Sequence, residues 1–317
     1  MQHDAVIIEV GVNENLSRTR HRHVPITAAE IALDAGACQD AGAAIVHWHA
    51  RDDATGEPVL DDAARYAAAM RAVRPERDLL MYPTYTTTPS DSPDVRFAHV
   101  WELRSTCGLE LAPVDLGSVN LAPWDVSQHR FAAPTELLGA PTVFQNSAGL
   151  LIATIERAVS LGMTPAVAAF DVGFTRMMVL LVEAGILPTP VYLKIFLSEG
   201  LAAGPFPDER GLDAHLSQIP DGLDVEWCVV PFHVRDPALV ERLSRYALER
   251  GGSVRVGIGD NPTAYPDATN ADLVEMATAW AAVAGRPVAT SGDVRQRFAI
   301  EDRLAGAATT ENGGGNG

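Results

Sequence analysis

Cysteine is scarce in this sequence, and its spacing argues against disulfide bonds. The chain has three, Cys38, Cys107 and Cys228, and no two of them form a Cys-x-x-Cys pair. An odd number of scattered cysteines is typical of free, buried thiols in a reducing compartment. We therefore expect a cytoplasmic protein without structural disulfides.

Long hydrophobic runs and positive charge are also scarce. No uncharged apolar stretch approaches the roughly 20 residues that span a bilayer, and the N-terminus lacks the basic and apolar regions of a signal peptide. The 24 Lys and Arg residues face 41 Asp and Glu residues, which gives a net charge of −17. Such a surface repels nucleic acids and anionic membranes. An anionic substrate would need a local basic pocket, so a buried arginine becomes a candidate binding residue.

The sequence does contain enough apolar residues for a large core. Of its 317 residues 47% are hydrophobic, and the length fits one α/β barrel with extra loops. Short apolar runs alternate with segments of helical periodicity. The runs predict strands at 5–12, 43–50, 78–84, 111–118, 141–145, 164–171, 190–197, 224–233 and 253–259. Helices are predicted at 27–41, 61–74, 148–161, 175–184, 237–250 and 271–284.

Most of the predicted strands are apolar throughout, which is typical of parallel strands covered by helices on both faces. Repeated β–α units of this kind form a closed barrel or a doubly wound open sheet. No Gly-x-Gly-x-x-Gly follows the first strand, which weakens the case for a dinucleotide-binding sheet. We predict the α/β class and a TIM (β/α)8 barrel, with one catalytic domain at 1–305 and a disordered tail at 306–317. The shortest strand, 141–145, exceeds the number that a barrel needs and is the candidate loop excursion.

Two histidines end the second predicted strand, in the segment Val46-His47-Trp48-His49. Alternate residues of a strand share a face, so His47 and His49 present both imidazoles to one point. At the mouth of a barrel such a pair suits zinc or a similar divalent ion. The alternative is a pair of hydrogen-bonded core histidines, but their place at the end of an apolar strand favours metal binding.

The last predicted strand contains an arginine and leads to an acid. Arg255 lies in an apolar run and needs a partner, because an unpaired buried guanidinium is costly. Asp260 follows at the C-terminal end of the strand, where barrel active sites are built. Beside an arginine this carboxylate stays ionised and positioned, and it could remove a proton alpha to a carbonyl. A structural salt bridge at the mouth is an equally good interpretation of the same residues.

Other polar residues recur at the ends of the predicted strands. Glu9 lies inside the first apolar run, where an acid must be paired, bind a metal or face solvent. Each such residue alone is usually an ordinary turn residue, but recurrence at successive strand ends is how barrel active sites are assembled. The further candidates are Asn13 and Glu14 after the first strand, Thr84, Ser118, Asn120 and Gln145 after the next ones, and His233 near the C-terminal side.

Taken in order, these segments resemble the β-keto acid cleavage enzyme family, whose prototype is the 3-keto-5-aminohexanoate cleavage enzyme. The likeness extends from about residue 5 to about residue 300. It is carried by residues 13–14, 25–31, 41–52, 117–120, 143–146, 170–173 and 254–261.

The resemblance implies a TIM barrel that assembles as a homotetramer, with zinc on His47 and His49. It implies a reaction in which a β-keto acid and acetyl-CoA give acetoacetate and a new CoA ester. By matching position, Arg255 and Asp260 would be the catalytic pair, and Glu14 an active-site glutamate that acts on the substrate. The expected substrate-binding residues are Thr84, Ser118, Asn120 and Gln145.

Two positions depart from the pattern of the family. The usual third zinc ligand is a glutamate just before the catalytic Asp, and here that position is Gly259. Glu9, Glu14 or His233 could replace it, or metal binding could be weak or absent. Where the prototype has a glutamate that pairs with the substrate ammonium, this chain has Gln145, so we expect a neutral or polar side group on the keto acid.

Two other functions stay open on the sequence alone. A metal-dependent hydrolase of the amidohydrolase type also uses His-x-His and a last-strand Asp, but it needs further histidines where Gln145 and Asp171 stand. A non-catalytic metal- or ligand-binding barrel would follow if the third ligand had been lost.

Overall fold

Eight parallel strands form the centre of the structure, a computed structural model that describes residues 4–132 and 143–313. Their order is β3-β2-β1-β12-β11-β10-β9-β4, and the outer strands β3 and β4 pack beside each other, so the sheet curls into a nearly closed barrel. The predicted TIM barrel is confirmed. The strands are β1 (Ile8–Gly11), β2 (Ile45–Trp48), β3 (Leu80–Pro83), β4 (Leu111–Asp115), β9 (Thr164–Ala169), β10 (Val191–Ser198), β11 (Val225–Phe232) and β12 (Ser253–Val256).

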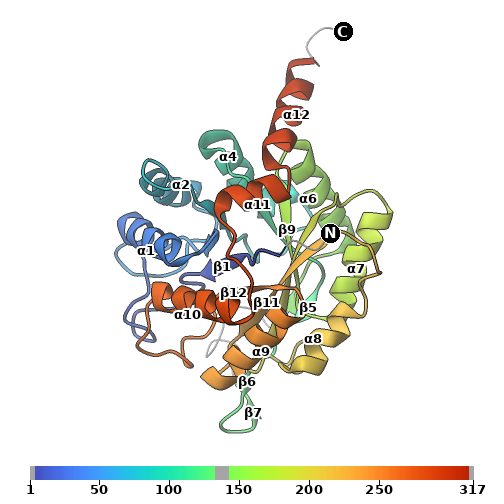
Figure 1. The fold of residues 1–317 in the computed structure, drawn as a ribbon. Coiled ribbons are helices and arrows are strands. Elements are labelled where there is room, and N and C mark those ends of the chain that lie inside the picture. Colours follow the sequence, from blue (N-terminus) through green and yellow to red (C-terminus); the bar gives the residue numbers. More distant parts are fainter. Residues whose placement is uncertain (1–3, 133–142, 314–317) are drawn as a thin grey trace.

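Helices surround the barrel and follow each of its strands (Figure 1). Thr27 caps the first helix in a capping box with Glu30, and Asp236 caps the helix that starts at Pro237. The sequence analysis missed α3, α4, α8, α11 and α12. The helices are α1 (Ala28–Ala41), α2 (Ala63–Val73), α3 (Pro93–Arg96), α4 (Ala98–Cys107), α6 (Ala148–Ser160), α7 (Val172–Glu183), α8 (Glu209–Leu216), α9 (Pro237–Glu249), α10 (Asn270–Val283), α11 (Ser291–Arg297) and α12 (Ile300–Gly313).

The predicted strand at 141–145 is not part of the barrel. Its described part contains β8 (Val143–Phe144), which pairs antiparallel with β5 (Val119–Asn120), and residues 141 and 142 lie outside the described residues. A second short hairpin pairs β6 (Trp124–Asp125) with β7 (Arg130–Phe131). Both belong to the long connection after β4, as expected for a loop excursion.

The prediction of a disordered tail from residue 306 is wrong for residues 306–313, which continue helix α12. The segment from Leu304 to Ala308 contains three alanines, and alanine has the highest intrinsic helix propensity. Residues 314–317 lie outside the described residues.

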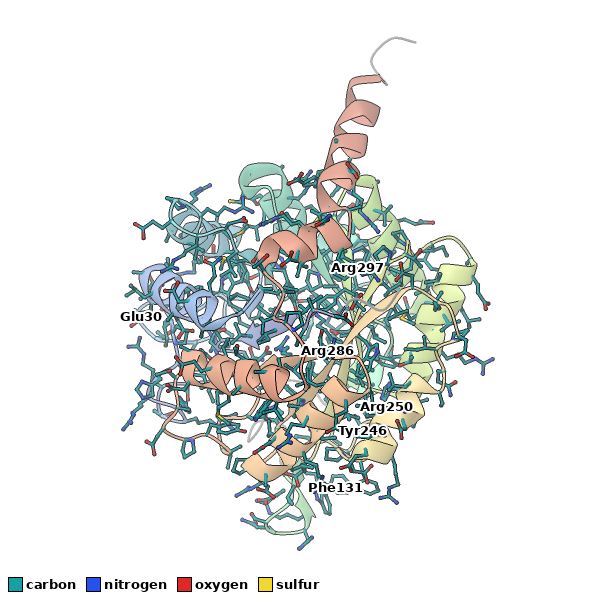
Figure 2. The ribbon with its side chains drawn as sticks, viewed as in Figure 1. Glu30, Phe131, Tyr246, Arg250, Arg286 and Arg297 are labelled. Atoms are coloured by element: carbon teal, nitrogen blue, oxygen red, sulfur yellow. The ribbon has the colours of Figure 1, made fainter. Side chains whose placement is uncertain are left out.

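The two ends of the barrel have different surroundings. The C-terminal ends of the strands, which we call the mouth, are covered by the long connections and short hairpins. The N-terminal ends, which we call the base, are covered by α11, whose Arg295 pairs with Glu110 before β4 and whose Arg297 pairs with Glu226 at the start of β11. Arg286, which is labelled with Arg297 in Figure 2, donates to the backbone carbonyl of Leu248 at 3.0 Å. In the part of the chain that the structure describes, no helix has the length and apolar character needed to cross a membrane.

Candidate active site

The two histidines of β2 point into the barrel at its mouth. Their Nε2 atoms lie 3.2 Å apart, and both rings line one cavity. Nδ1 of His47 lies 3.2 Å from the carbonyl of Tyr82, and Nδ1 of His49 lies 2.9 Å from Oδ1 of Asn15. These contacts orient the rings so that each Nε2 is turned to the same point. Burial lowers the pKa of His47 well below its usual value, which keeps this imidazole neutral and available as a ligand.

Glu14 contacts both histidines from the loop that follows β1. Its Oε1 lies 3.4 Å from Nε2 of His47, and its Oε2 lies 3.1 Å from Nε2 of His49. The ligand atoms of these three residues all lie within 4.8 Å of one another, so they could hold a metal ion. Glu14 has a φ of 40°, which is uncommon for a residue other than glycine. Arg51 supports this backbone by donating to the carbonyls of Glu14 and Leu16.

Of the three candidates for a third ligand, only Glu14 contacts the histidines. Glu9 is buried below them, and it accepts hydrogen bonds from the hydroxyls of Tyr82 and Tyr192 at 2.5 and 2.7 Å. His233 lines a different cavity. Burial alone would raise the pKa of Glu14, but the neighbouring charged groups outweigh this effect and hold that pKa well below its usual value. Glu14 is therefore an ionised carboxylate at the ligand position.

The structure also explains why position 259 is a glycine. A Cβ atom on Gly259 would lie 2.8 Å from the carbonyl oxygen of Gly11 and 2.9 Å from Cγ of Glu14. Both distances are too short for a normal contact, so a side chain at position 259 would displace Glu14. The glycine at position 259 therefore leaves the space that Glu14 occupies.

Arg255 of β12 joins three carboxylates below the histidines. Its Nε and Nη2 donate to the two oxygens of Asp260 at 3.0 and 2.8 Å, and its Nη1 donates to Glu9 at 3.0 Å. Nη2 also donates to Glu14, which links this pair to the histidine group. The side chains of Arg255, Glu9 and Asp260 are at most 2% exposed. The Arg255–Asp260 pair expected from the sequence is present.

Burial raises the pKa of Asp260 to about 7, although Arg255 opposes the shift. Such a carboxyl group exchanges its proton near neutral pH, which suits a general base. Asp260 is fully buried and is not among the residues that line the cavity, whereas Arg255 and Glu14 are. Arg255 thus stands between Asp260 and the cavity.

The cavity at the mouth has a volume of about 150 Å³. Thr84 lines it, in the place expected for a substrate-binding residue. Ser118, Asn120 and Gln145 do not line it, and they are exposed on or beside the β5–β8 pair. Ser118 accepts a hydrogen bond from the backbone of Asn146 at 2.9 Å. The structure therefore brings one of the four expected substrate residues to the histidines and places the other three on the excursion.

Three ionisable residues in the cavity wall were not predicted from the sequence: Tyr85, Asp115 and Lys194. Tyr85 donates to Asp115 at 2.7 Å, and Nζ of Lys194 donates to the hydroxyl of Tyr82 at 2.8 Å. Lys194 interrupts the apolar strand β10, and it is the only lysine in the chain. The sequence signal for Lys194 was one ionisable residue within an otherwise apolar strand, and the same signal pointed to Glu9.

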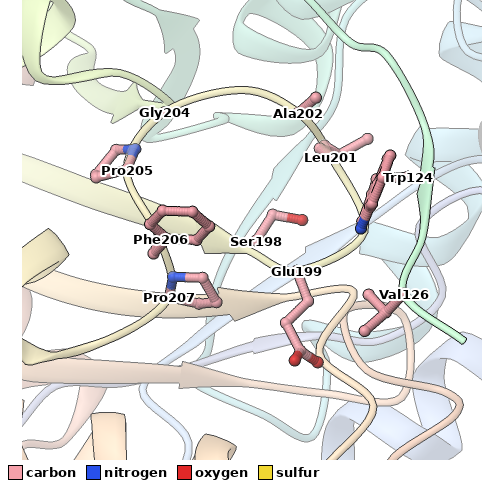
Figure 3. A pocket seen from close by; sticks show the side chains of 10 residues that line it. All are labelled: Trp124, Val126, Ser198, Glu199, Leu201, Ala202, Gly204, Pro205, Phe206 and Pro207. Atoms are coloured by element: carbon pink, nitrogen blue, oxygen red, sulfur yellow. The ribbon is translucent and has the colours of Figure 1, made fainter. Parts of the chain in front are cut away.

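A larger cavity, of about 510 Å³, lies next to the first one at the mouth. Ser198 of β10 lines it, two residues beyond Phe196 in the wall of the first cavity. Figure 3 shows Phe206 on one side of this cavity and Trp124 on the other. The backbone N–H of Trp124 donates to the carbonyl of Gly200 at 2.9 Å, which holds the two walls together. The mostly apolar wall offers space for a second, larger ligand.

A parallel barrel with polar residues gathered at the C-terminal ends of its strands defines the class of TIM-barrel enzymes, here with a candidate metal site of two histidines and one glutamate. The sequence comparison is more specific. The profile of the β-keto acid cleavage enzymes matches residues 5–300, and the chain belongs to this family. The resemblance seen in the sequence is thereby confirmed.

Several characterised relatives are similar over most of their length. A 3-dehydrocarnitine:acetyl-CoA trimethylamine transferase of Rhizobium meliloti is 26% identical over 92% of this chain and 95% of its own. A 3-keto-5-aminohexanoate cleavage enzyme of Acetoanaerobium sticklandii is 25% identical over 90% and 94%. A 3-oxoadipate:acetyl-CoA acetyltransferase of Cupriavidus necator is 26% identical over 91% and 93%.

Solved structures support the fold. ObcA in its binary complex with oxaloacetate superposes with a TM-score of 0.62 at 16% identity, over 87% of this chain and 67% of that one. The apo structure of ObcA gives 0.61, and the chain spans 65% of it. At this identity the likeness concerns the barrel alone.

Proposed function

We propose that the protein is a zinc-dependent enzyme that joins a β-keto acid with acetyl-CoA and releases acetoacetate and a new CoA ester. The observation that carries the proposal is the contact of Glu14 with both His47 and His49 at the mouth of a barrel of this family. The names of two relatives specify acetyl-CoA as a reactant, which supports the choice of the second substrate.

The donor set fits zinc. Two imidazoles and one carboxylate are a common catalytic zinc site that leaves one position for the substrate. The local charge also favours a cation. Three carboxylates contact the single guanidinium of Arg255, and a divalent cation would offset the excess negative charge. A bound divalent ion would polarise the keto oxygen of the substrate and stabilise negative charge on it.

Arg255, Thr84 and Asp260 would act on the keto acid. Arg255 keeps one uncommitted N–H, and with the Thr84 hydroxyl it can hold the carboxylate next to the keto group. Asp260 would accept the proton from the carbon between these groups, since its pKa of about 7 suits transfer near neutral pH. Because Arg255 separates Asp260 from the cavity, this step requires that the bound substrate shift the guanidinium.

Acetyl-CoA would bind across the second cavity. The pantetheine arm is long and narrow, and the wall between Trp124 and Phe206 is mostly apolar. An adjoining cavity is lined by Arg20 and Arg235, neither of which forms an ion pair with another described residue. Two free guanidinium groups on an otherwise acidic protein are suited to the phosphates of CoA.

The family does not define the side group of the keto acid. The relatives are named for 3-dehydrocarnitine, which carries a cation, and for 3-oxoadipate, which carries a second carboxylate. The homotetramer and the cytoplasmic location also stay predictions.

The proposal is tested by metal analysis and acyl exchange on the purified protein. We expect one zinc per chain after expression with added zinc, and conversion of acetyl-CoA to a new acyl-CoA with a panel of β-keto acids. Glu14→Gln should lose both, whereas the matched variant Glu110→Gln at the base should keep both. Zinc without exchange on any keto acid would indicate a non-catalytic barrel, and cleavage without CoA would indicate a hydrolase.

A further inference from the structure

Lys194 is the cation of the candidate site with the most unused hydrogen-bonding capacity. Its side chain is buried, it lines the cavity at the mouth, and its one hydrogen bond is donated to the Tyr82 hydroxyl. An ammonium group has three N–H donors. No carboxylate among the described residues lies within ion-pair distance of Nζ. A buried ammonium that is not paired by the protein is suited to an anionic ligand.

Lys194 belongs to β10, but its Nζ reaches Tyr82 of β3, whose ring packs against that of His47 with the centroids 4.7 Å apart. Three strands separate β10 from β2 in either direction around the barrel, so the two strands face each other. Lys194 pairs in register with Ala168 of β9, which pairs with Asp115 of β4.

Arg255 differs from Lys194 in how much of it the protein already uses. Four of its donor contacts go to Asp260, Glu9 and Glu14, so little is left for a substrate. With Thr84, Arg255 can serve the carboxylate beside the keto group on the histidine side. Lys194 then remains in the same cavity as a second cation for a second anionic group.

The acids near Lys194 have other partners. Glu9 accepts from two tyrosine hydroxyls and from Arg255. Asp115 accepts from Tyr85, and burial raises the pKa of Asp115, which reduces its negative charge. Burial lowers the pKa of Lys194, and an adjacent anionic ligand would favour its charged form. A less charged Asp115, beside a Lys194 that its ligand keeps charged, favours an anion over a cation in this part of the cavity.

We propose that Lys194 binds a second carboxylate on the side group of the keto acid, so that the substrates are 3-oxo dicarboxylic acids. The inference rests on the proposed function. It replaces the neutral or polar side group expected from Gln145, because Gln145 lies outside the cavity and Lys194 lines it.

A matched pair of substrates tests the proposal. 3-Oxohexanedioate and 3-oxohexanoate share six carbons and differ at the far end, where one has a carboxylate and the other a methyl group. A charge-assisted hydrogen bond contributes about 1.5–3 kcal/mol, so we expect the dicarboxylate to be favoured about 10- to 100-fold in kcat/KM. Lys194→Met should abolish this preference through KM of the dicarboxylate, and KM of acetyl-CoA should not change.

Arg295→Gln at the base is the matched control, because it also removes one cation but lies far from the cavity. Arg295→Gln should keep the full preference for the dicarboxylate over 3-oxohexanoate. Lys194→Arg keeps the charge and should retain part of it. If Lys194→Met slowed both keto acids equally, or if the wild type favoured an aminated or methyl-ended keto acid, the proposal would be overturned.

A binding measurement separates this proposal from the proposed function. Because the chain has a single lysine, protein labelled with ε-15N-lysine gives one side-chain ammonium signal. We expect glutarate to shift this signal saturably and butyrate to leave it unchanged. A glutarate response without acyl exchange would support the role of Lys194 while contradicting the proposed reaction. No response would overturn the role of Lys194, as would trapping of a keto acid on Nζ by borohydride.

Discussion

The two ends of the barrel use the same kinds of charged residue with different results. At the base, Arg295 donates to Glu110 and to Asp78, whose side chain is 76% exposed, so water shares in the solvation of these charges. At the mouth, Arg255 contacts Glu9 and Asp260, which are fully enclosed. An arginine with partly hydrated partners ties elements together, whereas an enclosed arginine with too many carboxylates invites a cation or a substrate.

The mouth also contains residues with uncommon backbone conformations and with shifted pKa values. Glu14 and His233 have positive φ angles of 40° and 52°, whereas Ala299, with a φ of 48°, is such a residue at the base. Burial raises the pKa of Asp260 at the mouth to about 7. Perturbed titration and strained backbone gather at functional sites because the surrounding fold can hold them there. These differences indicate that the mouth is organised for binding and the base for stability.

The largest expected effect comes from removing a ligand at the mouth. His47→Ala should lose bound zinc and lower kcat by about three orders of magnitude, because a metal supplies several kcal/mol of charge stabilisation. Metal analysis and the acyl-exchange rate check this. His215→Ala is the matched control, since His215 is buried against Thr175 away from the cavity. It should lower Tm and keep zinc; loss of zinc in both variants would contradict the assignment.

Asp260→Asn should lower kcat about 10²- to 10⁴-fold, the range for a lost general base. In the wild type the rate should rise with pH through about 7, because Asp260 must be deprotonated to accept a proton. The variant should lose this rise. A loss of less than about tenfold, with the pH profile intact, would instead mean that Asp260 only positions Arg255.

At the base the same type of change should affect stability alone. Arg295→Gln leaves Glu110 half-paired in a site where both side chains are less than one-fifth exposed. We expect unfolding to be easier by about 1–3 kcal/mol, with unchanged kcat and zinc content. Chemical denaturation and the exchange assay measure the two quantities. A lower kcat at full zinc occupancy would contradict the division of roles between the two ends.

The smallest effect concerns Asp34 of α1, which lies behind the mouth and accepts from Asn270 at 2.7 Å. Burial raises the pKa of Asp34 to about 7. The folded protein therefore holds this proton up to about pH 7, while the unfolded chain releases it near pH 4. The contribution to stability is fully present below pH 4 and is lost as pH rises to 7.

Asp34→Asn should therefore stabilise the protein at pH 8 relative to the wild type, by on the order of 1 kcal/mol, and less at pH 5. Thermal unfolding at the two pH values measures this difference. Asp40 is the matched control on the same helix, because the Arg77 side chain lowers the pKa of Asp40. Asp40→Asn should show no gain at pH 8. An Asp34→Asn gain independent of pH would contradict the shifted pKa.

Much of the fold and part of the site followed from local patterns. Continuous apolar runs identified the barrel strands, and two-residue spacing placed His47 and His49 on one face, since the backbone alone determines which side chains share a face. The Arg255–Asp260 pair followed from the cost of an unpaired buried guanidinium. Helix α4 begins after Phe97 without a side-chain cap, whereas α1 begins at the Thr27 capping box, so the sequence had a start signal for α1 and none for α4.

The substrate residues were harder to predict. Ser118 and Gln145 are near strand ends in the sequence, but the β5–β8 pair turns them away from the cavity. Lys194 lies in the middle of β10, where sequence gives no sign of whether a side chain faces the cavity. Residues on long excursions depend on how those excursions fold back, which no local pattern encodes.

The sequence by itself determined the barrel, the family and the histidine pair, because strand periodicity and apolar runs are local properties of the chain. The contact of Glu14 with the histidines and the position of Lys194 in the same cavity follow only from the tertiary structure. Glu14 lies in a loop after β1, and Lys194 comes from a strand on the other side of the barrel, so both contacts depend on packing between segments distant in the sequence.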